Sequence, residues 1–401
     1  MEFVTSFQSD RLKEAREARG LFQTELARQL KVTPGAVSQW ENGHSVPSPA
    51  HRRQLAELLD VKERYFSWSP PPAIEGPAFF RSLAATTKRE RVRAERESGW
   101  VSHLIRAVEA RVELPELVFP PPPERDWRAL STTAIEEEAD RLRSLWGLGK
   151  GPISNLVWLL EGNGIVVVRL DVASERLDAH SWWTPSGRAA IWLSSNKASA
   201  VRSRFDAAHE LGHLLLHRRV SSKEFRKAGV LKELEAQANR FASAFLMPAE
   251  SFSREMREPS LDWFRVLKPR WKVAIAAMIY RVQDLGIVSE RQATSLWKGR
   301  SARGWTKREP LDDELLPERP RVLHDAFELL IEEGAVHVDE LRDILPLPGS
   351  EIERLAGLGE GFLSSRSQPV VSLHPRSRGT GGQDSSGKTN VVHFPNRKGE
   401  T

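Results

Sequence analysis

Two proline-rich segments set the strongest limit on how this chain folds, because proline has no amide hydrogen to donate and interrupts helices and strands. They are SPPPAIEGP at residues 69–77 and PELVFPPPPERDW at residues 115–127. We interpret both as parts of linkers. The chain has 401 residues, 40% of them hydrophobic, so the segments between and beyond the linkers are long enough to form separate compact domains.

The composition excludes several kinds of chemistry. The chain has no cysteine, so disulfides, thiolate nucleophiles and iron–sulfur clusters are ruled out, and any metal must bind to His, Asp or Glu. The net charge of +5 arises from 59 basic and 54 acidic residues, a balance that does not by itself indicate nucleic acid. The sequence starts without a secretory pattern and has no apolar run near the roughly 20 residues of a membrane span. We therefore expect a cytoplasmic protein with no membrane partner.

Four helices are predicted between residues 9 and 66, because apolar residues recur there at helical spacing. The segments are SDRLKEAREARG, QTELARQLKV, TPGAVSQWENG and SPAHRRQLAELLDV. One shared core is predicted from Leu12, Ala15, Leu26, Ala27, Leu30, Val37, Trp40, Leu55, Leu58 and Leu59.

The second and third of these helices form a helix-turn-helix pattern. Thr33 can cap the third helix, and Pro34 suits its first position. Such a motif places its later helix in the major groove of DNA. Gln39 is the best candidate for reading a base, because its amide matches the edge of adenine. The other candidate DNA-binding residues are Gln23, Thr33, Gly35, Ala36 and Ser38, with Arg16, Arg28 and Lys31 as further phosphate contacts.

This segment resembles the Xre/Cro type of helix-turn-helix domain through LFQTELA, VTPGAVSQWENG and LAELLDV. The resemblance implies binding to double-stranded operator DNA, for which a homodimer is the usual arrangement. One departure is Phe22, where the family usually has Ser or Thr, so we expect the second helix to lack its usual cap. The alternative is a helical bundle that serves only protein contact or dimerisation.

Beyond the linkers, helices flank a small sheet. Helices are predicted for IEEEADRLRSLWGLG and ISNLVWLLEGNG, then strands for GIVVVRL, LDAHSWW and AAIWLS, then helices again for FDAAHELGHLLLHRR and LKELEAQANRFASAFLM. This order is typical of an α+β domain. The predicted fold class is therefore multidomain: an all-α domain, an α+β domain and a small helical C-terminal region.

The sequence HELGH at residues 209–213 places two histidines and a glutamate on one predicted helix. His209 and His213 are four residues apart and share a face, so they can bind one metal ion with Glu210 beside them. Zinc held in this way acidifies a water molecule, and Glu210 can accept its proton during attack on a peptide carbonyl. The alternative is two structural histidines that lie one turn apart by chance.

A catalytic zinc ion needs a third protein ligand and an open fourth position. Glu235, which is flanked by small residues that allow close helix packing, is our choice, and Glu233 is the alternative. His217 is expected to lie too far along the helix to reach the same ion and to bond a backbone group or an acid. Asp206 is either a partner of a ligand or a helix-start residue.

A second resemblance covers roughly residues 130–310. GRAAIWLSSNKASAVRSRFDAAHELGHLLLHR, ELEAQANRFASAFLMP, LKPRWKVAIAAMIYRVQDLG and GWTKREP resemble the ImmA/IrrE family of zinc metallopeptidases. The resemblance implies that His209, His213 and Glu235 bind zinc and that Glu210 is the general base. Members of this family are associated with cleavage of a repressor protein during stress, often in mobile elements. We nominate AAIWLS as the edge strand that holds an extended substrate.

Taken together, the sequence predicts a transcriptional regulator whose zinc endopeptidase domain cleaves a regulatory protein such as a repressor. The alternative is a non-catalytic repressor or antitoxin whose peptidase-like domain is a sensor or a protein-interaction module. The expected regions are a DNA-binding domain at 1–68, a proline-rich and basic helical linker at 69–128, a metallopeptidase domain at 129–310, a helical appendage at 311–362 and a disordered basic tail at 363–401, with a docking strand in VVHF.

Overall fold

The chain forms two compact units in the computed structural model, which describes residues 6–69, 79–80, 87–123, 126–171, 177–195, 199–221, 224, 227–332, 345–365 and 392–393. The N-terminal unit lies within Met1–Pro71, Val92–Leu114 and Leu323–Pro395, and the central unit within Pro72–Arg91, Pro115–Val322 and Asn396–Thr401. Most of the proline-rich segment at 69–77 and of the tail at 363–401 lies outside the described residues.

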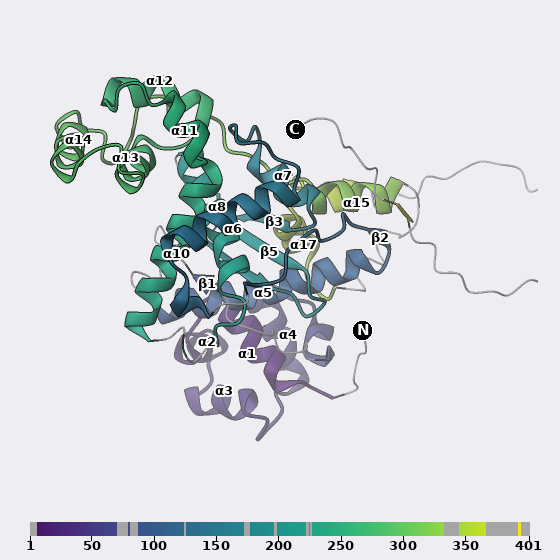
Figure 1. Ribbon diagram of the computed structural model, residues 1–401. Helices are drawn as coiled ribbons and strands as arrows, with labels where there is room; N and C mark the ends of the chain where they lie inside the picture. Colours follow the sequence, from purple (N-terminus) through teal and green to yellow (C-terminus); the bar gives the residue numbers. More distant parts are fainter. Residues whose placement is uncertain are drawn as a thin grey trace, which may run out of the picture. The chain divides into compact units, whose positions relative to one another are not determined.

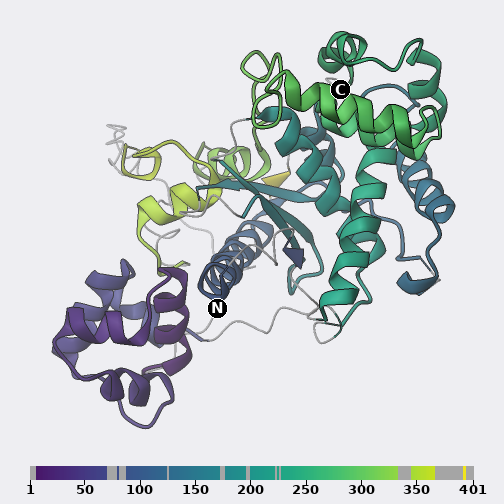
Figure 2. The ribbon, with the colours of Figure 1, turned by 90° about the vertical axis from the view of Figure 1, so that its left-hand side faces the viewer.

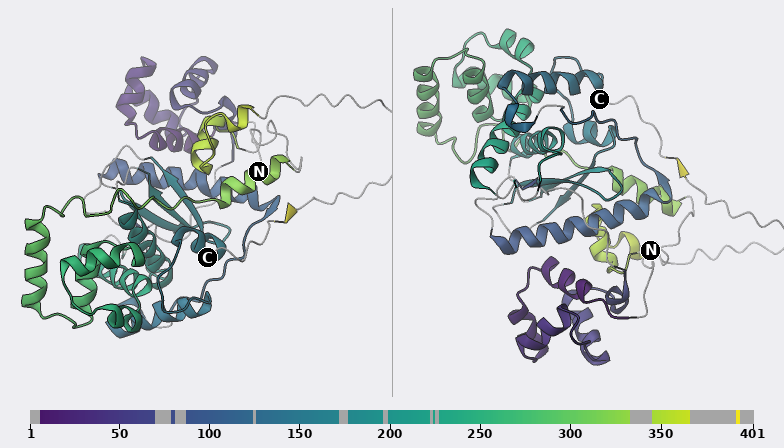
Figure 3. Two further views of the ribbon diagram at one scale, coloured as in Figure 1. Left: turned by 90° about the horizontal axis from the view of Figure 1, so that it is seen from above. Right: turned by 60° about the horizontal axis from the view of Figure 1, so that its bottom comes forward.

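The first helices of the N-terminal unit confirm the predicted helical domain. They are α1 Ser9–Ala18, α2 Gln23–Leu30, α3 Pro34–Glu41 and α4 Pro49–Leu59, followed by the 3-10 turn η1 Glu63–Ser67, and they cluster together in Figure 3. The predicted core residues are buried except Leu58, which is 39% exposed. The buried face of α4 is formed by Leu55, Ala56 and Leu59, and Leu58 lies about 100° away from the middle of that face.

Residues 92–114 also belong to the N-terminal unit. Helix α5, Lys88–Glu109, buries Trp100, Val101 and Leu104. The Trp100 ring nitrogen donates to the Tyr65 hydroxyl (2.9 Å), which in turn donates to Glu14 (2.6 Å). The segment expected to be a linker thus includes a long helix that is part of a packed core.

The rest of the N-terminal unit comes from the end of the chain. It comprises α15 Val322–Glu332, α17 Gly349–Ala356 and α18 Phe362–Ser365, together with the short parallel pair of β2 Val112–Glu113 and β6 Val392–His393. Strand β6 lies within VVHF, where the sequence predicted a docking strand.

The central unit is built around a mixed sheet in the order β1-β4-β5-β3. The predicted strands are present as β3 Val166–Leu170, β4 Ala179–Trp183 and β5 Ala189–Ser194, and Phe79–Phe80 adds β1. Strand β5 runs parallel to β3 and antiparallel to β4, and β1 runs antiparallel to β4. The nomination of AAIWLS as an edge strand is therefore wrong, because β5 has a neighbour on each side. All six of its residues are buried, as is typical of an interior strand.

Helices accompany this sheet, as the α+β pattern predicted (Figures 1 and 2). They are α6 Thr132–Leu145, α7 Leu156–Gly162, α8 Ala200–Leu216, α10 Ala228–Leu246, α11 Ala249–Glu255, α12 Leu261–Trp271, α13 Ile275–Asp284 and α14 Glu290–Ala302. Helix α8 packs against β4, β5 and α10. In the described part of the chain, no helix combines the length and the apolar character that a membrane span requires.

Candidate metal centre and nucleic-acid interface

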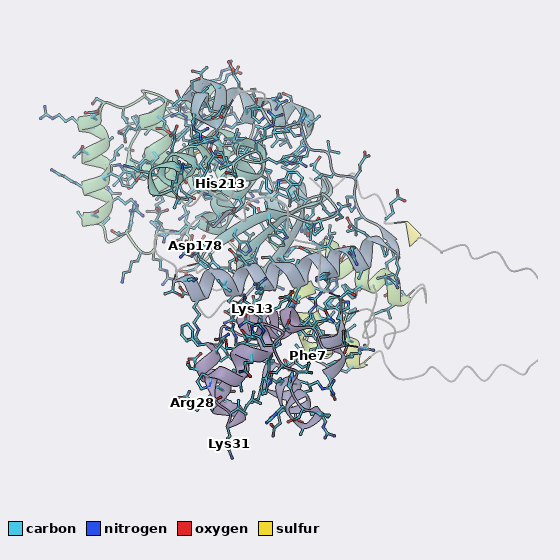
Figure 4. All side chains as sticks on the ribbon, turned by 90° about the horizontal axis from the view of Figure 1, so that it is seen from below. Phe7, Lys13, Arg28, Lys31, Asp178 and His213 are labelled. Carbon is cyan, nitrogen blue, oxygen red and sulfur yellow. The ribbon has the colours of Figure 1, made fainter. Side chains whose placement is uncertain are left out.

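Three side chains from α8 and α10 converge on one point in the central unit. The Nε2 atoms of His209 and His213 lie 3.0 Å apart. The Nε2 atom of His209 is 3.3 Å from Oε2 of Glu235, and that of His213 is 3.3 Å from Oε1 of Glu235. The structure thus brings together the three residues that the sequence predicted as ligands, and His213 lies in the interior of the central unit (Figure 4).

These separations fit a zinc ion. Ligand atoms at about 2.0–2.1 Å from a tetrahedral zinc lie about 3.3 Å from one another. Two imidazole nitrogens and one carboxylate are also a common ligand set of catalytic zinc, which leaves a fourth position open. Glu233, the alternative third ligand, is outside this group and instead lines a neighbouring cavity.

Glu235 is suited to be an anionic ligand. Its side chain is 20% exposed, whereas those of His209 and His213 are fully buried. Burial alone would raise the pKa of Glu235, but the close imidazoles of His209 and His213 outweigh burial and lower the pKa to about 2. The carboxylate is therefore ionised at neutral pH.

Glu210 is fully buried beside this group and is oriented from the sheet. The Ser181 hydroxyl on β4 donates to Oε2 of Glu210 at 2.7 Å. Sequence reasoning placed Ser181 on a strand but gave it no role. Its contact with Glu210 depends on how β4 packs against α8, which no local pattern specifies.

The second nitrogen of each histidine also has a partner. Nδ1 of His209 lies 3.0 Å from Oδ1 of Asn239, and Nδ1 of His213 lies 2.9 Å from Nδ1 of His217. The expectation that His217 bonds a backbone group or an acid is wrong, since its other nitrogen faces the amide oxygen of Gln237 at 2.9 Å. Burial lowers the pKa of His217 well below its usual range, so its ring is neutral.

A cavity of about 1300 Å³ adjoins this centre. Gln237 and Asn239, which contact His217 and His209, belong to its lining. Asp206 lines the same cavity and lies six residues after the first residue of α8, so the helix-start interpretation of Asp206 is wrong. Other residues of the lining are Asp178, Phe205, Glu233, Arg240 and Tyr280.

Gly212 allows α8 and α10 to approach closely. A Cβ atom at this position would lie 3.0 Å from Cδ1 of Phe241 and 3.3 Å from Cα of Ala238. Replacing Gly212 with alanine is therefore expected to lower the free energy of unfolding by about 1–3 kcal/mol. It should also weaken zinc binding, because it moves α10 and Glu235 away from the histidines. Chemical denaturation and zinc titration measure the two effects.

Gly229→Ala is the matched control for Gly212→Ala. Gly229 also lies in a helix, α10, but a Cβ atom there meets nothing within 4 Å. This control is expected to keep its zinc affinity and its stability, or to gain up to about 1 kcal/mol from helix propensity. Equal behaviour of the two variants would contradict the role given to Gly212.

The predicted DNA-binding residues lie around the start of α3. The Thr33 hydroxyl accepts a hydrogen bond from the amide of Ala36 at 3.2 Å and so caps the helix. Gly35 and Gln39 are exposed, whereas Ala36 and Ser38 are half-buried. Val37 and Trp40 are buried, so the inward face is the predicted one. Arg28 and Lys31 project outward from this domain (Figure 4).

Glu41 holds two of the residues proposed to contact phosphate. The guanidinium of Arg16 is buried and donates to both carboxylate oxygens of Glu41, at 2.5 and 2.9 Å. Arg16 is therefore a structural residue and not a phosphate contact. The Gln23 amide also donates to Glu41 (2.8 Å).

Phe22 lacks a capping side chain, as expected, but the Glu25 carboxylate accepts from its backbone amide at 2.7 Å.

Comparisons with known proteins agree with these two domains. Residues 12–66 match a helix-turn-helix family model, and residues 160–283 match the model of the IrrE N-terminal-like domain, Peptidase M78. No curated protein matches the chain. One solved structure that matches is a Mycobacterium tuberculosis transcriptional regulator, at 19% identity and a TM-score of 0.28 over 37% of this chain and 46% of that one. On the two family models, the chain combines an Xre-type helix-turn-helix domain with an IrrE-like domain of the Peptidase M78 type.

Proposed function

We propose that the chain is a DNA-binding transcriptional regulator with a zinc-dependent endopeptidase activity. His209, His213 and Glu235 are the proposed zinc ligands, and Glu210 is the proposed general base. The convergence of the two Nε2 atoms and the Glu235 carboxylate within 3.3 Å carries this proposal. A purely sensory domain has no physical need for a proton acceptor such as Glu210 beside the ligands.

The residues around the ion have separate tasks. Zinc, when bound, supplies a Lewis acid for the scissile carbonyl and brings the pKa of a water molecule near neutrality. Ser181 orients the Glu210 carboxylate, which accepts a proton from the attacking water and returns it to the leaving amine. Asn239 orients His209.

The proposed substrate is a regulatory protein such as a repressor, cleaved in a stress or mobile-element response. To test this, the zinc-loaded chain is incubated with a protein extract of the organism that encodes it. New protein N-termini are then mapped by mass spectrometry. Cleavage at discrete sites that a zinc chelator prevents supports the proposal. If the zinc-loaded chain produces no chelator-sensitive N-termini in the proteins of the extract, the peptidase assignment fails. The alternative of a non-catalytic repressor then gains support.

DNA recognition is proposed to depend on Gln39, Ser38, Ala36, Gly35, Thr33 and Gln23. Gln39→Ala is expected to reduce the preference for operator over unrelated DNA about 5- to 150-fold, because it removes a bidentate contact to a base. The operator is first selected from random duplexes with the wild-type chain. Fluorescence anisotropy with operator and scrambled duplexes then measures the preference.

Arg28→Ala is the comparison for Gln39→Ala, because Arg28 is an exposed candidate for phosphate contact. It should weaken binding to both duplexes alike and reduce the salt dependence by about one released ion. If Gln39→Ala also weakened both duplexes alike, Gln39 would not be the residue that reads bases.

A further inference from the structure

A chain of hydrogen bonds leads away from the candidate metal centre through His213. Nδ1 of His213 faces Nδ1 of His217 at 2.9 Å, and Nε2 of His217 faces Oε1 of Gln237 at 2.9 Å. The amide nitrogen of Gln237 donates to the backbone carbonyl of Trp127 at 2.8 Å. Three side chains therefore connect the centre to one fixed backbone group.

The chemistry of these groups fixes the direction of every bond. The Trp127 carbonyl can only accept, so the Gln237 amide nitrogen must face it and the amide oxygen must face His217. That oxygen accepts, so Nε2 of His217 carries a proton. Full burial disfavours a second proton on this ring, so its Nδ1 is an acceptor. His213 must then donate from Nδ1, which leaves the lone pair of its Nε2 directed toward His209 and Glu235.

Because His213 is buried, it depends on this series of hydrogen bonds. His213 and His217 are fully buried, and Gln237 is 6% exposed. Solvent therefore offers no ready replacement for the acceptor at His217. A His213 ring without that acceptor would leave a buried N–H unpaired, or would move its proton to Nε2, where it would block metal binding.

We propose that His217, held by Gln237, is a positioning residue that fixes the tautomer and the ring orientation of His213 for metal binding. This inference rests on the proposed function, because it concerns the same zinc site. His217 itself binds no metal in this arrangement. Its effect passes through His213, and the partners of metal-bound histidines typically change metal affinity 10- to 100-fold.

Two substitutions of His217 separate positioning from packing. His217→Phe keeps a ring of similar size but removes the acceptor, so zinc affinity should fall about 10- to 100-fold. His217→Asn loses more volume but places an amide oxygen near the position of Nδ1, so it should keep most of the affinity. Zinc dissociation constants are measured on the full chain by competition with a chelator, and the absorption spectrum of the cobalt-loaded chain reports the ligand geometry.

The opposite order contradicts the proposal. If His217→Phe bound zinc as the wild type does, or bound it better than His217→Asn, His217 would be a packing residue. A wild-type chain that binds no zinc would instead contradict the proposed function. The two failures are therefore distinguishable.

A measurement on the wild type avoids the risk that a variant does not fold. Nitrogen-15 spectra of the histidine-labelled, zinc-free chain report which ring nitrogen carries the proton. We expect the proton on Nδ1 of His213 and on Nε2 of His217. A proton on Nε2 of His213 would overturn the assignment.

Discussion

Replacing Glu210 with glutamine is expected to abolish detectable cleavage while leaving zinc binding intact. Glutamine has nearly the same shape and can still accept the hydrogen bond that Ser181 donates to Oε2 of Glu210 at 2.7 Å. It cannot accept the proton of the attacking water, and loss of a general base typically slows a reaction about 100- to 10,000-fold. The measurement is the rate at which zinc-dependent N-termini appear in equal amounts of wild type and variant.

Zinc content and operator affinity serve as internal controls for Glu210→Gln. Both should match the wild type, because Glu210 is proposed to bind neither zinc nor DNA. A variant that keeps both properties and still cleaves at the wild-type rate would remove Glu210 from the proposed chemistry. If Glu210→Gln regulated transcription as the wild type does, the non-catalytic alternative would be favoured.

Glu235→Ala is expected to lower zinc affinity by more than about 100-fold, because loss of a ligand costs more than loss of a ligand's hydrogen-bond partner. It leaves two neutral imidazoles without an anionic third ligand. The wild type should be stabilised by added zinc in proportion to the logarithm of zinc concentration over the dissociation constant. This zinc-dependent rise in Tm should disappear in Glu235→Ala at concentrations that saturate the wild type.

Glu233→Ala is the matched control for Glu235→Ala. Glu233 lies two residues earlier in α10 and lines the cavity, but is outside the group of converging donors. It should retain the wild-type response to zinc. If both variants lost the response equally, the loss would be explained by the negative charge of α10 in general. Glu235 would then not be assigned as a ligand.

Local patterns in the sequence were sufficient for most helices and strands. The spacing of apolar residues predicts α1 to α4, and the runs of β-branched and aromatic residues predict β3, β4 and β5. The four-residue spacing of His209 and His213 places them on one face of α8, and the small residues around Glu235 predict close packing of α10. These features are local, or they join two neighbouring helices.

Features that depend on several packed elements were missed. The pairing of β5 with both β3 and β4 is set by the whole sheet. A phosphate contact requires Arg16 to lie at the surface, yet Arg16 is buried and its partner Glu41 lies 25 residues away on α3. The contact of Ser181 with Glu210 depends on the packing of β4 against α8. The position of His217 along its own helix does not reveal its partner, because Gln237 comes from α10.

The measurement that tests the central claim most directly is the zinc content of the purified chain, determined by elemental analysis against protein concentration. The proposed site predicts about one zinc per chain, and it predicts that Glu235→Ala purifies with far less. No zinc in the wild type after reconstitution would contradict the claim. The convergence of His209, His213 and Glu235 would then be a structural feature of a non-catalytic DNA-binding protein.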